Sequence, residues 1–268
     1  MRKLAFIGVG NMAGAIIGGM LRSGAVDHAH LYLSDACADK TAPYAEKGAT
    51  VDSTPAVAAA ADCIVLSVKP QNFPDILPLL ATVPNIEKKL IITIAAGIRT
   101  ETVRAALGGA RVVRVLPNTP MLIGQGVSVI CRAPDVPAED FTYVSGMFEA
   151  SGRVHIIDED EMNRIISVTS SAPAYVFAFI DAILAGARAQ GLDDPALLSC
   201  ICDMVIGSAS LLREGGLSPE EQIKMVTSKG GTTERAMSVL RERDLCGIVL
   251  AAMQACTARA EELDTHKA

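Results

Sequence analysis

A glycine-rich segment near the start of the chain has the spacing of a dinucleotide-binding turn. Residues 6–14, FIGVGNMAG, place Gly8, Gly10 and an alanine in a G-x-G-x-x-A pattern. The first glycine permits a tight turn, the second leaves room for a pyrophosphate, and the alanine lets a helix pack on a strand. Asn11 and Met12 belong to the same predicted cofactor site. The alternative, a glycine-rich turn without a ligand, gives no reason for a second small residue at Gly10.

An acidic residue follows the next predicted strand, as a dinucleotide-binding unit requires. Ser34 and Asp35 end that strand, and the Asp35 carboxylate is expected to accept hydrogen bonds from the adenine ribose hydroxyls. The same carboxylate would repel a 2′-phosphate, and Lys40 is the nearby cation. We therefore expect NADH to be used at least comparably with NADPH. The alternative for Asp35 is a solvated turn residue.

Three further predicted strands end in short segments that are suited to hold the rest of the cofactor. In a parallel sheet these ends lie at one edge, where ligands bind, and small residues there let a flat nicotinamide approach the backbone. The alternative for Lys69 in the first of these segments is a surface lysine that precedes a loop proline, Pro70. The predicted cofactor-binding residues from these segments are Ser67, Val68, Lys69, Pro70, Ala95 and Asn118.

A second cluster of small and polar residues lies far along the chain, in the sequence TSKGGTTERAM at 227–237. Two glycines followed by two threonines at a predicted helix start expose backbone N–H groups that can hold a carboxylate or a phosphate. The alternative is a glycine that ends one helix and a threonine that caps the next. The residues concerned are Ser228, Gly230, Gly231, Thr232 and Thr233.

Histidine and cysteine placement narrows the chemistry. None of the four histidines, His28, His30, His155 and His266, accompanies a glycine loop, which disfavours a dehydrogenase that uses histidine as its acid or base. The seven cysteines are scattered through apolar stretches with no metal-ligand spacing, so no metal site is expected. They indicate reduced thiols and a cytoplasmic protein.

Composition excludes several classes of function. The 268 residues are 50% hydrophobic and carry a net charge of −6, so a core can form but no basic surface for nucleic acid is expected. The apolar start of the chain is interrupted by glycines and Asn11, which favours a strand and loop over a secretory signal. Asp181 interrupts the most apolar later stretch, so no membrane span is expected.

The pattern of hydrophobic residues predicts an α/β fold in two parts. Short apolar runs alternate with helical stretches in a manner typical of a doubly wound parallel sheet, with strands at 3–9, 30–34, 62–68, 89–95, 111–116, 126–131 and 153–157. From about residue 158 the period changes to that of helices, at 159–169, 173–190, 194–213, 219–226, 232–241 and 244–263. We assign 1–160 to a Rossmann-type dinucleotide-binding domain and 161–268 to an all-helical domain for substrate binding and dimerisation.

With these residues assembled, the chain resembles the pyrroline-5-carboxylate reductases over essentially its whole length. The matching segments, in the order of that family, are FIGVGNM at 6–12, VKP at 68–70, AAG at 95–97, PNTP at 117–120, SAPAYVF at 171–177 and TSKGGTT at 227–233. Two positions depart from the family pattern. Ser170 stands where the family usually has glycine, and Lys229 stands where it usually has proline.

The resemblance implies an oxidoreductase that transfers hydride from NADPH or NADH to 1-pyrroline-5-carboxylate, giving L-proline in the last step of proline biosynthesis. The Ser228 hydroxyl and the amides of residues 230–232 would hold the substrate carboxylate, and the Thr233 hydroxyl would orient the ring nitrogen. Lys69, Ala95 and Asn118 would lie around the nicotinamide. A cyclic imine that solvent protonates is already an electrophile, so no strong enzymatic acid is required.

Two alternatives stay open at this point. A β-hydroxyacid or 2-dehydropantoate type of reductase needs a catalytic lysine within a helix of the second domain, whereas Lys224 and Lys229 flank the paired glycines. A non-catalytic dinucleotide sensor would have no use for the loop at 228–233.

We also expect a homodimer, with a higher assembly of dimers left open. The segment 175–185 and much of 199–212 are apolar nearly all round, and such helices must be covered on every side. Helices exchanged between two copies would place the loop of one copy against the nucleotide domain of the other.

Overall fold

The computed structural model describes residues 1–265, with side chains as far as residue 263. It forms two compact units. The first contains residues 1–173 together with the part of helix α12 (Leu245–Thr265) that begins at Ala255, and the second is Ala174–Gln254. The predicted boundary at 160/161 separates a dinucleotide-binding domain from a substrate-binding and dimerisation domain. It stays a prediction, because it divides the chain by function, whereas the two units are defined by how compactly they pack.

The first unit is built on a sheet of eight strands in the order β3-β2-β1-β4-β5-β6-β7-β8. Most of its inner strands are continuous apolar runs that are buried on both faces, as the sequence predicts. The strands are β1 Leu4–Ile7, β2 Leu31–Ser34, β3 Thr50–Val51, β4 Cys63–Leu66, β5 Leu90–Thr93, β6 Arg111–Leu116, β7 Gly126–Arg132 and β8 Gly152–Ile156.

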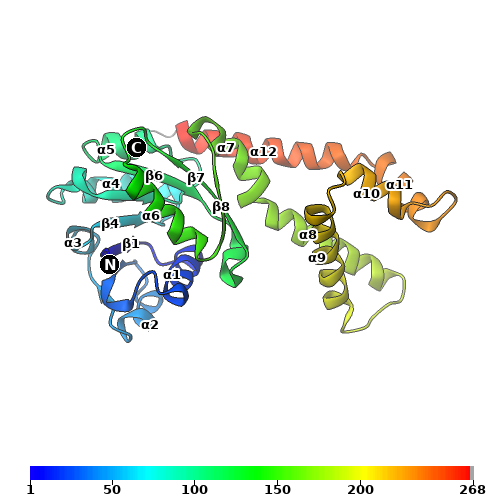
Figure 1. Cartoon of the computed structure of the whole chain (residues 1–268), viewed down its shortest axis with the longest axis horizontal. Helices are drawn as coiled ribbons and strands as arrows, with labels where there is room; N and C mark the ends of the chain where they lie inside the picture. The colour runs from blue at the N-terminus through cyan, green and yellow to red at the C-terminus, as the bar shows by residue number, and fades with distance from the viewer. Residues whose placement is uncertain (266–268) are drawn as a thin grey trace. The chain divides into compact units, whose positions relative to one another are not determined.

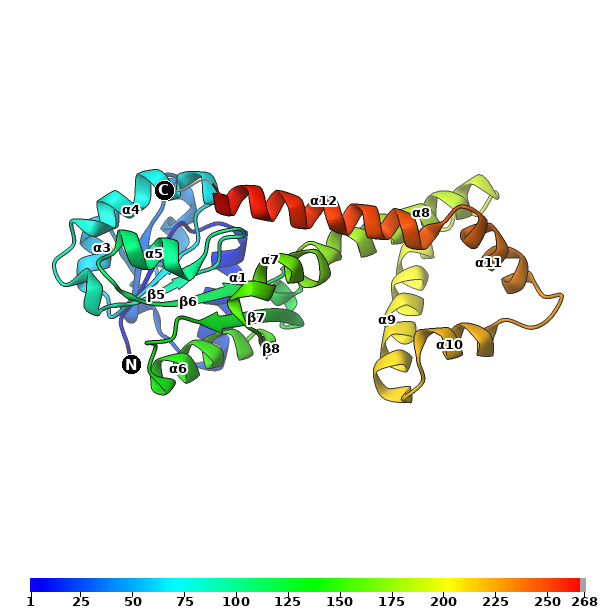
Figure 2. The ribbon, with the colours of Figure 1, turned by 90° about the horizontal axis from the view of Figure 1, so that it is seen from above.

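Helices cover both faces of this sheet (Figures 1 and 2). One face packs against α1 (Asn11–Ser23) and α6 (Ala138–Glu149), and the other packs against α3 (Thr54–Ala60), α4 (Phe73–Ala81) and α5 (Thr100–Ala106). Phe6 and Ile7, which are neighbours on β1, point to opposite faces and belong to the two different cores. The doubly wound α/β fold is therefore confirmed.

Strand direction differs from the predicted all-parallel sheet at one side. β1 to β6 are parallel to their neighbours, but β7 is antiparallel to β6, and β8 runs parallel to β7. The short turn region after β6, which contains the 3-10 helix η5 (Thr119–Ile123), leaves no room for a crossover helix. The two-residue strand β3 is absent from the prediction because Thr50 and Val51 are exposed and carry no apolar pattern.

A connecting segment leads out of the sheet and contains a π-helical turn. It begins with the short helix α7 (Met162–Ile165), continues in the π-helix η7 (Ile166–Ser170) and ends at α8 (Ala172–Ala189). Met162 and Ile166 are buried with Leu116, the last residue of β6. This packing holds the π-helical turn close to the carboxyl end of β6.

The second unit consists of helices with little apolar core of their own. Besides parts of α8 and α12 it contains α9 (Leu197–Gly215), α10 (Pro219–Val226) and α11 (Thr232–Glu242). Ile201 is the buried hydrophobic residue of α9, while Phe177 on α8 and Ile206 on α9 are 61% and 64% exposed. Exposed apolar side chains of this kind mark an interaction surface.

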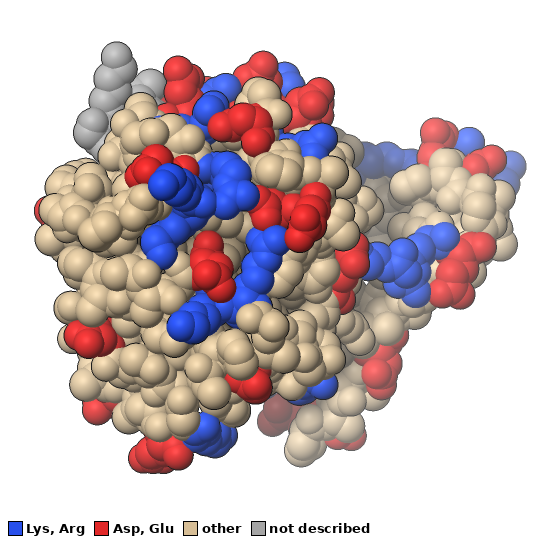
Figure 3. Space-filling view, turned by 60° about the vertical axis from the view of Figure 1, so that its left-hand side comes forward, with Lys and Arg blue, Asp and Glu red and all other residues tan. Residues whose placement is uncertain are grey.

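Charges on the sheet unit are mixed in sign. On the face shown in Figure 3, lysine and arginine side chains lie among aspartates and glutamates. Within the sheet unit, lysines and arginines also form ion pairs, such as Arg2 with Asp140 at 2.7 Å and Arg104 with Asp135 at 2.9 Å. This face therefore presents no continuous basic surface of the kind that nucleic-acid binding uses.

Candidate active site

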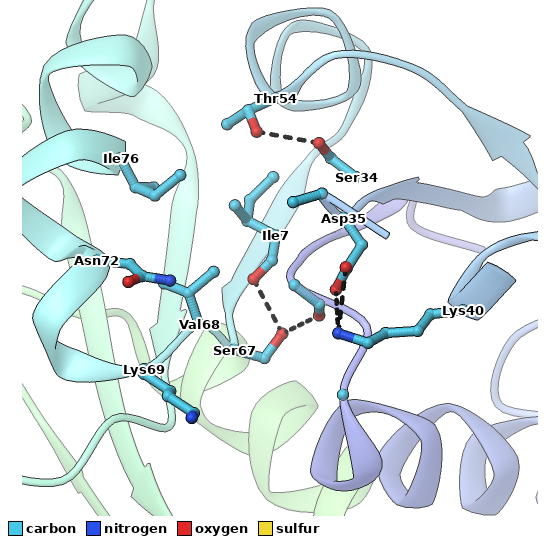
Figure 4. A pocket seen from close by; sticks show the side chains of 13 residues that line it. Ile7, Ser34, Asp35, Lys40, Thr54, Ser67, Val68, Lys69, Asn72 and Ile76 are labelled. Atoms are coloured by element: carbon cyan, nitrogen blue, oxygen red, sulfur yellow. Dashed lines mark hydrogen bonds and ion pairs between the residues drawn. The ribbon is translucent and has the colours of Figure 1, made fainter. Parts of the chain in front are cut away.

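A cavity of the sheet unit opens at the carboxyl ends of β1, β2 and β4 (Figure 4). Chain order along the sheet reverses between β1 and β4, and ligands of open α/β sheets bind outside the strand ends at such a switch point. The cavity has a volume of about 640 Å³ and is lined by Ile7, Gly8, Gly10, Ser34, Asp35, Ala36, Lys40, Thr54, Ser67, Val68, Lys69, Asn72 and Ile76.

The two glycines of the N-terminal motif have separate roles. Gly8 has a φ of +92°, and a Cβ atom there would lie 2.9 Å from Val68 Cγ1 and 3.0 Å from the Ser67 carbonyl. Glycine is therefore needed both for conformation and for the close approach of the two strand ends. A Cβ atom on Gly10 would meet no protein atom within 4 Å. The space at Gly10 faces the cavity and fits a cofactor pyrophosphate at the N-terminus of α1.

Ser67 and Val68 join the end of β4 to the glycine turn. The Ser67 hydroxyl is within hydrogen-bonding distance of the Gly8 carbonyl, 2.6 Å, and of the Ile7 carbonyl, 3.1 Å. The Ser67 amide also donates to the Ile7 carbonyl at 2.9 Å. These contacts hold the wall of the cavity in place before any ligand binds, which lowers the cost of ordering the site.

The Asp35 side chain lines the cavity and also accepts a hydrogen bond from the backbone of the glycine turn. Its carboxylate accepts hydrogen bonds from the Val9 amide at 2.7 Å and the Cys37 amide at 2.8 Å, and it pairs with Lys40 at 3.2 Å. Burial raises the pKa of Asp35, but the two amides and the Lys40 ammonium outweigh burial and hold the pKa below its usual value. Asp35 is therefore ionised at neutral pH and fastens the turn to the end of β2.

Six lining residues are not among the predicted site residues: Ile7, Ala36, Lys40, Thr54, Asn72 and Ile76. The Thr54 hydroxyl is 3.0 Å from the Ser34 hydroxyl, and together they form a polar wall beside Asp35. Thr54 begins α3 shortly after the unpredicted strand β3 ends, so no sequence pattern placed it at this edge of the sheet. Asn72 and Ile76 follow Pro70, where the sequence indicates only a loop.

The other predicted cofactor-binding residues lie outside this cavity. Asn11 and Met12 form the first turn of α1, and Pro70 begins a 3-10 helix after β4. Ala95 is buried beyond the end of β5. The Asn118 side chain is occupied within the protein, because its amide nitrogen donates to the Thr169 carbonyl at 3.2 Å and its oxygen accepts from the Val127 amide at 2.8 Å.

The predicted substrate loop adopts the glycine conformation that its sequence indicates. Gly230 has a φ of +74°, and Thr232 begins α11. The Gly230 amide donates to the Glu234 carboxylate at 2.8 Å, and the Gly231 amide donates to the Ser228 carbonyl at 3.0 Å. Two of the three amides expected to hold a substrate carboxylate thus have protein acceptors. Thr232 and Thr233 lie in the first turn, where a helix leaves its N–H groups without intrahelical partners.

Neither lysine of the runner-up mechanism is buried within a helix. Lys224 is in the last turn of α10 and forms an exposed ion pair with Glu220 at 2.9 Å, and Lys229 is exposed in the loop. His28 and His30 lie in a 3-10 turn beside Asp27, and none of the histidines within residues 1–265 lines the cofactor cavity. His266 and Lys267 lie outside the described residues.

Fold and site together define a class of protein: a reductase-type oxidoreductase with a Rossmann-type sheet and a helical domain. Comparison with known families gives the same division. Residues 3–97 match a family described as NADP oxidoreductase, coenzyme F420-dependent. Residues 159–263 match the pyrroline-5-carboxylate reductase dimerisation family.

Similar proteins extend over the whole chain. A pyrroline-5-carboxylate reductase of Vibrio alginolyticus is 36% identical over 270 residues, with 98% of each chain covered. A solved pyrroline-5-carboxylate reductase of Coxiella burnetii has 30% identity and a TM-score of 0.86, covering 98% of this chain and 99% of its own. The fold is also that of a Plasmodium falciparum pyrroline carboxylate reductase solved with NADP bound, at 24% identity, 98% coverage of both chains and a TM-score of 0.91. The chain belongs to the pyrroline-5-carboxylate reductase family.

Proposed function

We propose that this protein reduces 1-pyrroline-5-carboxylate to L-proline with NADPH or NADH as the hydride donor, the last step of proline biosynthesis. The observation that carries the proposal is the family membership over 98% of the chain, combined with an intact cofactor cavity and substrate loop. The β-hydroxyacid type of reductase is not favoured, because it needs a lysine in the middle of a helix, whereas Lys224 is exposed in the last turn of α10 and Lys229 is exposed in the loop.

The cofactor residues fit the adenosine and pyrophosphate parts of a nicotinamide dinucleotide. Gly10 leaves the space at the N-terminus of α1 open, where the helix dipole favours a negative group. Ser34 and Thr54 offer hydroxyls near the ribose position, and Asp35 and Lys40 lie next to them. Lys40 is the cation in this wall that can meet a 2′-phosphate, so both cofactors remain candidates and NADH is expected to be used at least comparably.

The chemistry that the reduced nicotinamide supplies when bound is transfer of a hydride to the imine carbon. The protein's part is to position the two reactants and exclude water, since the imine nitrogen takes its proton from solvent. We assign Thr233 as the residue that hydrogen-bonds the ring nitrogen. Ser228 and the amides of Gly230, Gly231 and Thr232 are assigned to the substrate carboxylate.

The contact between Gly230 and Glu234 supports the assignment of the loop. The Glu234 carboxylate has the same chemistry as the substrate carboxylate, and it bonds a loop amide at 2.8 Å. The Gly230 N–H is therefore directed so that a carboxylate can accept a hydrogen bond from it. Substrate binding in this place requires Glu234 to share or release the Gly230 amide.

The assembly that fits the helical unit is a homodimer, and a higher assembly of dimers is a further step. Residues 159–263 match a dimerisation family, and large apolar side chains on α8 and α9 are exposed. The helical run 159–189 is also long and apolar enough to cross a membrane by length and composition. We propose that a second copy of the chain covers the exposed apolar side chains of α8 and α9. The loop at 228–233 of one copy would then serve the nucleotide domain of the other. The free cysteines support the expected cytoplasmic location.

A cuvette assay tests the proposed function. Purified protein with 1-pyrroline-5-carboxylate should oxidise NADPH or NADH and should leave both unchanged with 2-keto acids. Turnover of 2-dehydropantoate or a β-hydroxyacid, with none of the cyclic imine, would overturn the proposal.

A further inference from the structure

Ser170 carries a hydroxyl group that is buried and has no hydrogen-bond partner among residues 1–265. Leaving such a group unpaired costs free energy, so a buried orphan hydroxyl requires an explanation. The neighbouring hydroxyls show how easily a partner is found. Ser167 donates to the Arg164 carbonyl at 2.9 Å, and Thr169 donates to the Ile165 carbonyl at 3.2 Å.

Ser170 lies in a helical turn that is wider than an α-helical one. Ser170 is the last residue of the π-helix η7, and the Ser171 amide bonds the Ile166 carbonyl five residues back, at 2.9 Å. This widened turn displaces side chains from the positions that an α-helix would give them, and such turns are frequent at functional sites. Ser171, by contrast, has a partner in the Cys256 thiol at 3.3 Å.

The π-helical turn is held over the ends of β5 and β6. Asn118 bonds the Thr169 carbonyl, one residue before Ser170, and Ile166 is buried in one cluster with Leu116. Ala96, which follows β5, packs on the same cluster. The adenosine end of the cofactor cavity lies at β1, β2 and β4, so a dinucleotide that extends along the same edge brings its nicotinamide toward β5 and β6.

We propose that the Ser170 hydroxyl hydrogen-bonds the carboxamide of the bound nicotinamide ring. A carboxamide has both a donor and an acceptor, which matches a hydroxyl that lacks both kinds of partner. Asn118 acts as the positioning residue that fixes the turn from which Ser170 projects. The inference rests on the proposed function for the presence of a nicotinamide cofactor, and it gives a role to a residue at which this chain departs from the glycine usual in its family.

The test measures binding and not turnover. The dissociation constants of NADPH and NADH are measured by titrating the fluorescence of the reduced ring, and that of ADP-ribose, which lacks the ring, by calorimetry. Ser170→Ala and Ser170→Gly should each weaken binding of the reduced cofactors about three- to tenfold and leave ADP-ribose binding unchanged. Two variants are used so that a folding defect in one does not decide the result, and thermal unfolding checks both.

Ser151→Ala is the matched control, because the Ser151 hydroxyl is also buried without a partner but packs against Gly19 on α1. It should change none of the three dissociation constants. Unchanged cofactor affinity in both Ser170 variants would overturn the inference and leave the proposed function intact, and so would an equal loss of affinity for ADP-ribose. A wild-type protein that binds neither reduced cofactor would overturn both. If the Ser170 variants lose affinity for the reduced cofactors but the wild-type protein does not reduce the cyclic imine, this inference is supported and the proposed reaction is wrong.

Discussion

Replacing Asp35 with asparagine removes the charge that fastens the glycine turn to β2. The Asp35 side chain is only 9% exposed, and its two oxygens accept from the Val9 and Cys37 amides at 2.7 and 2.8 Å. Asparagine has one acceptor oxygen, so one amide loses its partner and the other keeps a weaker, neutral bond. The expected loss is about 1–3 kcal/mol, mainly from the weakened charge-assisted bond to the part-buried Val9 amide, because the exposed Cys37 amide can bond water instead.

The pH dependence of this loss follows from the pKa of Asp35. Its folded-state pKa is below the unfolded value, so its contribution to stability is present above the unfolded pKa and disappears as pH falls through the folded pKa. The difference between wild type and Asp35→Asn should therefore be constant from pH 8 to about pH 5. It should shrink only below about pH 4, near the usual pKa of an aspartate.

Urea unfolding at fixed protein concentration, repeated from pH 8 to pH 3, measures this difference. Asp39→Asn, an exposed aspartate four positions along, is the control and should shift the midpoint little. Asp35→Asn also frees Lys40, so the kcat/KM ratio of NADPH to NADH should rise about tenfold, or 1.4 kcal/mol. A stability change under 0.5 kcal/mol at pH 7, or one that persists undiminished at pH 3, would refute the structural role of Asp35.

Four further predictions can be checked separately. Gly8→Ala should lower the melting temperature and abolish cofactor binding, because its φ of +92° and the nearby Val68 exclude a Cβ atom; normal NADPH affinity would contradict this. Thr233→Ala should lower kcat/KM about ten- to a hundredfold with cofactor affinity nearly unchanged, and unaltered kinetics would assign Thr233 to helix capping alone. Wild-type kcat/KM for NADH should be within about tenfold of that for NADPH, and a larger NADPH preference would show that the Asp35 charge does not decide the choice. Phe177→Glu should dissociate the dimer in sedimentation and abolish activity, whereas a fully active monomer would disprove the shared site.

Much of the fold is predictable because burial on both faces leaves a clear pattern. The inner strands β1, β4 and β5 are runs of apolar residues, and their order with the intervening helices identifies a doubly wound sheet. Direction is not encoded in such runs, so the reversal at β7 is not predictable from hydrophobicity. β3 escapes prediction because its two residues are held by backbone pairing to β2 and not by burial.

Candidate site residues are predictable where backbone geometry demands them, and less so where side-chain direction decides. Gly8 and Gly10 follow from the space and conformation that a cofactor turn needs. The engagement of Asp35 with the Val9 amide depends on its rotamer, which no spacing reveals. Thr54 enters the cavity because β3 and α3 bring it there, and the orphan hydroxyl of Ser170 appears only once the π-helical turn is known.

The most direct test of the central claim follows the transferred hydrogen into the product. The protein is incubated with 1-pyrroline-5-carboxylate and NADH or NADPH deuterated at the transferred position of C4, and the product is examined by mass spectrometry and NMR. The account predicts L-proline with a single deuterium on the former imine carbon, formed in proportion to the cofactor oxidised. Proline without deuterium, or cofactor oxidation without proline, would contradict it.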